Sequence, residues 1–168
     1  MGKIIITNIW GKHKDISVVE CIEEKTSKEK IKFFSFINTE DKFINQCRYE
    51  SVFSFNDGMA KVKMNSCWGV IDKNGVELIP ATYKHIYTLH NKLFQVCIDN
   101  LWGIINSKNE TIVPIIYDYV FPPIQAYIII KQNGKYGVID YNGNKYIEAE
   151  WNSYNEALNQ LKEKFNLI

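Results

Sequence analysis

The chain has 168 residues, of which 46% are hydrophobic and 14% aromatic. This length supports one ordinary globular domain that needs neither disulfides nor metal to hold its core, and the aromatic content excludes a disordered chain. Twenty basic and nineteen acidic residues leave a net charge of +1. Such a balance excludes the strong basic excess that is typical of nucleic-acid-binding proteins, so we expect no nucleic-acid partner.

Residues 1–31 are predicted to form an N-terminal β extension. Apolar residues are concentrated in Lys3–Ile9 and Ile16–Ile22, which predicts two strands joined by a loop through Trp10–His13. The mixed-charge segment 23–30 is typical of a solvated hairpin loop. Trp10 is followed by glycine, as are aromatic residues later in the chain, but it precedes Phe34 by 24 positions and lies out of register with them.

Residues 32–154 contain an internal repeat with a period of 34 residues. An aromatic residue followed by glycine occurs at Trp68-Gly69, Trp102-Gly103 and Tyr136-Gly137. Columns of isoleucine, of aromatic residues and of proline recur at the same offset, which predicts about three and a half units. The first unit is degenerate, with Phe34-Ser35 at the position of the pair. The columns are Ile37/Ile71/Ile105/Ile139, Tyr49/Tyr83/Tyr117/Trp151 and Pro80/Pro114.

The residue types predict strands, although some helical repeats share this period. Asn65-Ser66 and Asn74-Gly75, with their counterparts in later units, are typical of two-residue hairpin turns, because Asn and Gly tolerate positive φ. Between the turns, β-branched and aromatic residues alternate with polar ones at a period of two. Each unit should therefore contain three short strands, near 59–64, 67–72 and 76–79 in the first complete unit.

The aromatic-glycine pair is expected on the central strand of each unit. Glycine weakens a strand because it has no side chain to pack, and a large ring on a neighbouring strand can cover the gap. Val70 and Ile71 are both apolar, which predicts burial on both faces. Polar side chains end these strands and are expected to accept hydrogen bonds from backbone amides of the next turn. They are Asp72, Asn106 and Asp140.

The segment Trp68-Gly-Val-Ile-Asp-Lys-Asn-Gly75, followed by Ile79-Pro80 and Tyr83, resembles the WG (or KWG) repeat family of bacterial β-repeat proteins. The resemblance covers roughly residues 32–154 and implies an all-β fold of tandem antiparallel hairpins. The family is defined by structure and not by an activity, so the resemblance implies no catalytic residue and no cofactor. The last unit departs from the pattern at Ile147-Glu148, as terminal units of repeat proteins do.

The C-terminal residues 153–165 are predicted to form a capping helix. Asn152 or Ser153 can serve as its N-cap, and apolar residues from Ala157 to Phe165 lie along one face. Such a helix can cover the edge of the final sheet, which would otherwise invite pairing with another strand. We expect the whole chain to be one domain.

No segment predicts targeting or a membrane span. Thr7 and Asn8 interrupt the apolar run after Lys3, and no stretch approaches the roughly 20 apolar residues of a spanning helix. We therefore expect a cytoplasmic protein that binds no membrane. The cysteines have no Cys-x-x-Cys spacing and are predicted to be reduced, mostly buried thiols, with a secreted two-disulfide form as the alternative. They are Cys21, Cys47, Cys67 and Cys97.

Candidate catalytic and metal-binding groups are few. His85, His90 and Cys97 match no known zinc spacing, so we expect no metal. Cys97 aligns with Lys63 and Lys131 at an outward strand position, which predicts an exposed thiol; a catalytic role together with His90 is a third hypothesis. Glu148 and Glu150 are expected to form a solvated edge. The sequence as a whole predicts a protein that is not an enzyme.

The remaining candidate is a binding surface. A repeat scaffold keeps its core columns fixed and varies the face that meets a partner. Two columns vary in charge or type, which predicts contact with another protein, although unconstrained surface positions would vary in the same way. The predicted partner-binding residues are Glu50, Lys84, His85, Asp118 and Tyr119.

The leading functional hypothesis is a non-enzymatic interaction protein of a bacterial cytoplasm. By analogy alone, such a protein could act as an immunity factor against a toxin or as an adaptor in a defence system. The alternative is a module that binds a sugar or a cell-wall fragment on exposed rings of Tyr87, Tyr119 and Phe121. Burial of these rings would exclude the sugar hypothesis.

Overall fold

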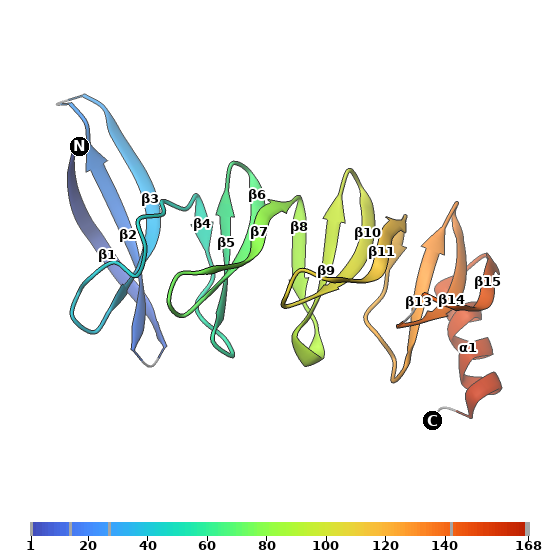
Figure 1. Ribbon diagram of the computed structural model, residues 1–168. Helices are drawn as coiled ribbons and strands as arrows, with labels where there is room; N and C mark the ends of the chain where they lie inside the picture. The colour runs from blue at the N-terminus through green and yellow to red at the C-terminus, as the bar shows by residue number, and fades with distance from the viewer. Residues whose placement is uncertain (1, 14, 27, 142, 167–168) are drawn as a thin grey trace. The chain divides into compact units, whose positions relative to one another are not determined.

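The computed structural model describes residues 2–13, 15–26, 28–141 and 143–166. The chain divides into two compact units, Met1–Tyr83 (unit 1) and Lys84–Ile168 (unit 2). The strands are antiparallel throughout, and the described helix lies at the C-terminal end (Figure 1). None of the described helices is long and apolar enough to cross a membrane.

Unit 1 contains two sheets. The first, repeat 1, has the order β1-β2-β3. Two isolated bridges, from Phe34 to Tyr49 and from Ile37 to Phe43, pair the outer side of β3 with the segment that follows it. The second, repeat 2, has the order β4-β5-β6-β7. The strands are β1 (Lys3–His13), β2 (Ile16–Glu24), β3 (Lys30–Asn38), β4 (Ser51–Val52), β5 (Met59–Met64), β6 (Cys67–Asp72) and β7 (Glu77–Tyr83).

Unit 2 also contains two four-stranded sheets and ends in a helix. Repeat 3 has the order β8-β9-β10-β11, and repeat 4 has the order β12-β13-β14-β15. The elements are β8 (His85–Thr88), η1 (His90–Lys92), β9 (Leu93–Ile98), β10 (Leu101–Asn106), β11 (Thr111–Tyr117), β12 (Tyr119–Val120), β13 (Tyr127–Gln132), β14 (Lys135–Asp140), β15 (Lys145–Trp151) and α1 (Tyr154–Phe165).

The predicted all-β repeat fold is confirmed. In repeat 2, β5 and β6 have the expected bounds, β7 runs on past Pro80 to Tyr83, and β4 is a fourth strand beyond the three expected. Both residues of the Asn65-Ser66 turn have positive φ, as a primed turn requires. The turn at Asn74-Gly75 differs from the expected two-residue turn. Only Gly75 has a positive φ there, and the amide of Asp72 donates a hydrogen bond to the carbonyl of Val76, which closes a longer loop. Asp72 Oδ1 accepts hydrogen bonds from the amides of Asn74 and Val76, as predicted.

The predicted loop at Trp10–His13 is wrong, because β1 continues as a strand to His13. Trp10 pairs with Val18 between β1 and β2. In repeat 2, Phe53 lies opposite Lys61 in the same way, and its amide donates a hydrogen bond to the carbonyl of Lys61. Trp10 therefore occupies the place of Phe53 in a hairpin that is longer. Trp10 precedes Phe34 by 24 positions, whereas Phe53 precedes Trp68 by 15, so nine additional residues in the β2–β3 hairpin hide the repeat.

The glycine of each aromatic-glycine pair is explained by a close approach between strands. The register between β6 and β7 shifts after Trp68, so that the backbone around Pro80 bulges toward Gly69. A Cβ on Gly69 would lie 2.6 Å from the carbonyl oxygen of Ile79 and 2.8 Å from the amide nitrogen of Ala81. The glycine is thus needed because no side chain fits between the strands, and proline is tolerated in the bulge because the ladder is interrupted there.

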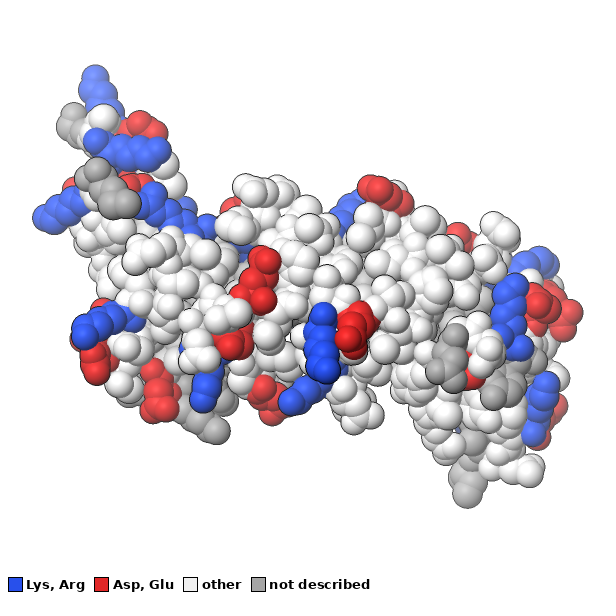
Figure 2. All heavy atoms as spheres, in the orientation of Figure 1, with Lys and Arg blue, Asp and Glu red and all other residues white. Residues whose placement is uncertain are grey.

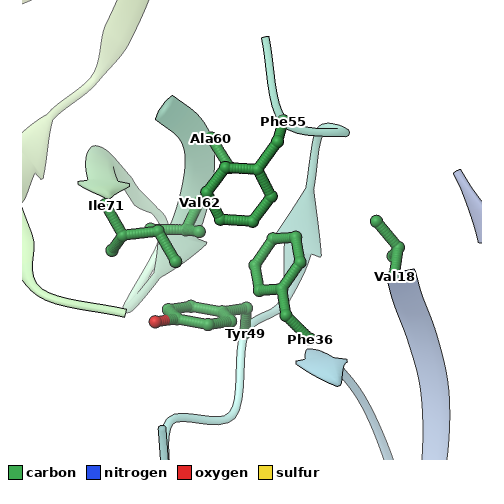
Figure 3. Close-up of a cluster of buried hydrophobic side chains, with 7 residues drawn as sticks. All are labelled: Val18, Phe36, Tyr49, Phe55, Ala60, Val62 and Ile71. Atoms are coloured by element: carbon green, nitrogen blue, oxygen red, sulfur yellow. The ribbon is translucent and has the colours of Figure 1, made fainter. Parts of the chain in front are cut away.

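The cores lie between and over the sheets. In unit 1, Phe36 packs its ring toward Tyr49 and Phe55, with centroids 6.1 and 5.0 Å away, and faces Val62 of the second sheet (Figure 3). In unit 2, Ile104 and Val120 belong to one core that joins repeats 3 and 4. Within each unit, apolar side chains from the two sheets therefore bury one another, which stabilises both repeats of that unit.

The C-terminal helix is confirmed, but its role differs from the expected one. Ser153 is the N-cap, and its hydroxyl accepts a hydrogen bond from the amide of Glu156. Ala157 and Leu161 are fully buried against Ile129 and Val138. Because these partners lie in β13 and β14, the helix covers the face of the final sheet and not its edge.

Candidate functional site

A pair of aromatic rings recurs at the same place in every repeat. The first ring lies on the first strand of the sheet or directly after it, and the second lies on the third strand. The ring centroids of Trp10 and Phe34 are 5.7 Å apart, and those of the three later pairs are 5.5–6.1 Å apart. The later pairs are Phe53/Trp68, Tyr87/Trp102 and Phe121/Tyr136.

In unit 2 the pairs are joined into one continuous row of rings. Tyr119 links repeat 3 to repeat 4, since its ring lies 5.1 Å from Trp102 and 4.8 Å from Phe121. We call the rings of His85, Tyr87, Trp102, Tyr119 and Phe121 the aromatic strip. Tyr87 is 49% exposed and the other four side chains are half-buried. The strip is therefore a surface feature that is held in place by ring-to-ring packing.

Three rings of the strip form a cluster with a shared orientation. The centroids of His85, Tyr87 and Trp102 are 5.7–6.4 Å apart, and their planes lie within 14° of one another. Three centroids at such similar distances cannot form a single column, so the rings are spread laterally. The exposed parts of these aromatic π systems attract flat or cationic groups.

Lysine side chains lie over the equivalent rings of the other repeats. Lys63 Nζ is 5.9 Å from the centroid of Trp68, and Lys131 Nζ is 5.5 Å from that of Tyr136. In repeat 1, Lys32 Nζ lies 5.6 Å from Phe34. Among the residues that the structure describes, no lysine or arginine lies over Trp102.

The predicted exposed thiol at Cys97 is wrong, because Cys97 is 1% exposed. Cys97 pairs with both His85 and Trp102 in the sheet, so its side chain lies on their face, where these larger rings cover it. Burial raises the pKa of the Cys97 thiol, which disfavours the reactive thiolate. His90 is exposed on the short η1 turn. The four cysteines are free, with Cys21 buried, Cys67 half-buried and Cys47 exposed.

The charged column that was predicted to bind a partner has an internal role. Glu50 accepts a hydrogen bond from the amide of Ser66, and Asp118 accepts one from the amide of Gly134, 16 positions later in each case. Lys84 instead donates from Nζ to Asn100 Oδ1 at 2.7 Å. Each of these side chains therefore bonds to the tip of the hairpin that follows it in the chain. The tip beside Lys84 offers an acceptor, Asn100 Oδ1, which matches a positive side chain in place of a negative one.

Of the predicted partner-binding residues, the structure brings His85 and Tyr119 into the aromatic strip, while Glu50, Lys84 and Asp118 lie at exposed hairpin tips. Sequence reasoning alone assigns Trp102 to packing and so misses its place in the strip. The signal was present in the two aromatic columns at Tyr87 and Trp102, but reading it needs the strand register.

The electrostatic surface is mixed. Basic and acidic side chains are interspersed over both units on the face shown in Figure 2, without a large area of one sign. Within the described part of the chain, no three His, Cys, Asp or Glu side chains gather as metal ligands would. Glu148 and Glu150 are exposed on β15, where Lys145 Nζ lies 3.0 Å from Glu148.

The comparison with protein families gives one finding. A family model described as WG containing repeat matches residues 34–66, 68–102 and 102–136. No curated protein matched the chain, and no solved structure did. The three matched segments follow one another along most of the repeat region and include the strip.

Proposed function

The chain belongs to the WG containing repeat family, and on this premise we propose that it is a non-enzymatic protein that binds another protein through the aromatic strip. The observation that carries the proposal is the continuous row of partly exposed rings from Tyr87 to Phe121. Tyrosine and tryptophan are enriched at the energetic centres of protein interfaces. Because these rings already pack on one another in the free chain, their side chains lose little conformational entropy when a partner binds.

The burial of Cys97 supports a role without catalysis. A nucleophilic thiol must be accessible and ionised, whereas Cys97 is covered and its pKa is raised by burial. The strip itself contains no carboxylate or hydroxyl nucleophile paired with a base. Its groups are suited to contact and not to group transfer.

The hairpin tips form a polar rim in this proposal. Glu50, Lys84 and Asp118 remain exposed while they hold the tips, so they can meet a partner at the edge of an interface. Rim charges contribute more to association rate than to affinity. Immunity against a toxin, or an adaptor role in bacterial defence, is the specific form of binding that we propose, by analogy alone.

The proposal is tested by capturing the partner with the tagged full chain from its native host. The strip variant is His85→Ser/Tyr119→Ser, because Ser51 occupies this column in repeat 2 and the fold accepts serine there. The matched control is Ile116→Ser, which removes a side chain that is 52% exposed outside the strip. We expect one stoichiometric protein that is lost only from the strip variant. Equal capture by both variants overturns the proposal.

A sugar or cell-wall fragment is the second candidate ligand. The near-parallel rings of His85, Tyr87 and Trp102 favour it, because sugar rings stack on aromatic faces. Thermal-shift screening with soluble oligosaccharides and muropeptides separates the two candidates. Stabilisation of the wild-type chain that is absent from the strip variant, without any captured protein, would replace the first proposal with this one.

A further inference from the structure

The other repeats indicate what kind of group belongs over the rings of repeat 3. Trp68 has the ammonium of Lys63 near its ring, and these two residues are directly paired between β5 and β6. Tyr136 and Lys131 have the same relationship between β13 and β14. The scaffold thus places a cation over the ring of the central strand wherever this column holds lysine.

Repeat 3 lacks this internal cation. Cys97 stands in the column of Lys63, and Gln95 stands in the column of Lys61, whose Nζ lies 4.3 Å from the ring of Phe53. The amide of Gln95 is instead bonded to the carbonyl of Val120, and the nearby Lys84 is engaged with Asn100. Neither residue supplies a positive charge to Trp102.

The same repeat enlarges the surface that a cation would contact. Where repeat 2 has Ser51, repeat 3 has His85, whose ring lies 5.7 Å from Trp102 and within 9° of its plane. Tyr87 adds a third ring, and about half of its side chain is exposed. Indole is the best of the aromatic acceptors for a cation.

We propose that the cluster of His85, Tyr87 and Trp102 receives an arginine or lysine side chain of the partner protein, in the place that a lysine of the chain itself fills in the other repeats. This inference rests on the proposed function and specifies the chemistry of the partner. A partner cation would complete in repeat 3 the contact that Lys63 makes in repeat 2.

The test is a nuclear magnetic resonance titration of the full chain with acetyl-Gly-Gly-Arg-Gly-Gly-amide. The neutral control is the same peptide with citrulline, which keeps the shape of arginine and removes its charge. We expect the indole N–H resonance of Trp102 to shift with the arginine peptide, and the citrulline peptide to bind about two- to fivefold more weakly. The indole of Trp68, already covered by Lys63, should move less.

Two reciprocal variants make the test specific. His85→Ser/Cys97→Lys copies Ser51 and Lys63 into repeat 3 and should abolish the response of Trp102. Lys63→Cys uncovers Trp68 and should make its resonance respond to the arginine peptide; this variant keeps the test decisive if the first does not fold. Equal shifts with arginine and citrulline, or no response of Trp102, overturn the inference. If the partner is nevertheless captured through the strip, the proposed function stands and only its cationic chemistry fails.

Discussion

The side-chain amide of Gln95 donates a hydrogen bond of 2.5 Å to the carbonyl oxygen of Val120. Gln95 lies on β9 and is 3% exposed, while Val120 ends β12, so this bond ties repeat 3 to the edge strand of repeat 4. It also supports the strip, because Tyr119 and Phe121 flank Val120 in the chain. A buried polar contact of this kind specifies how two apolar sheets meet.

Replacing Gln95 by isoleucine, the residue type found at the equivalent Ile129, should destabilise the chain. The carbonyl of Val120 then loses its side-chain partner in a buried setting, and we expect a loss of about 1–3 kcal/mol in the free energy of unfolding. Urea denaturation measures it, with Gln46→Ile at an exposed position as control. Stability equal to the wild type would show that the bond contributes nothing.

Gly103→Ala should destabilise the chain by about 1–3 kcal/mol or more, because the added methyl group overpacks a closed site. Its Cβ would lie 2.6 Å from the carbonyl oxygen of Val113 and 2.9 Å from Cα of Ile115. Gly58→Ala is the control, since nothing lies within 4 Å of its Cβ and only its positive φ is strained. Thermal unfolding compares them, and a smaller loss at Gly103 than at Gly58 would contradict the close-approach account.

Arg48→Met should cost about 3–5 kcal/mol, because it leaves the carboxylate of Glu23 buried without a partner. Arg48 contacts both carboxylate oxygens, at 2.5 and 3.1 Å, and the Glu23 side chain is 3% exposed. The double change Glu23→Gln/Arg48→Met should recover most of the loss. Glu40→Gln, which breaks an exposed pair with Lys42, should cost no more than about 1 kcal/mol. A double-mutant cycle with no coupling between positions 23 and 48 would refute the prediction.

Alkaline pH should destabilise the fold through its buried tyrosines. Burial raises the pKa of Tyr49, Tyr83, Tyr117 and Tyr141. In the unfolded chain tyrosine loses its proton near pH 10. The folded chain then holds more protons than the unfolded one, so stability is fully present below about pH 9 and falls as pH rises through 10 and above. Chemical denaturation at pH 8 and pH 10.5 measures the fall, and Tyr117→Phe should reduce it; an unchanged fall would contradict the assignment.

The later repeats are predictable from the sequence because their turn chemistry is local. Asn65 and Gly75 adopt positive φ where their residue types favour it, and the strands between them alternate in polarity. Repeat 1 is harder to recognise, since the lengthened β2–β3 hairpin shifts Trp10 relative to Phe34. A fixed offset along the chain cannot reveal a partner that an insertion has displaced.

The site is only partly predictable, for a different physical reason. His85 and Tyr119 are identified as candidates from their variable column, but the strip also depends on Trp102 reaching across β9 and on Tyr119 joining two sheets. These contacts arise between strands and between repeats. In the same way, the charge reversal at Lys84 suggests a partner until the hairpin tip is seen to explain it.

The claim that the aromatic strip is the binding surface is tested most directly by hydrogen exchange of the full chain, alone and in complex with the captured protein. We predict slower backbone exchange on binding in β8, in the first half of β10 and from Tyr119 to Phe121, with the other strands little changed. Protection confined to unit 1 or to α1, with exchange in β8 and β12 unaltered, would contradict the account.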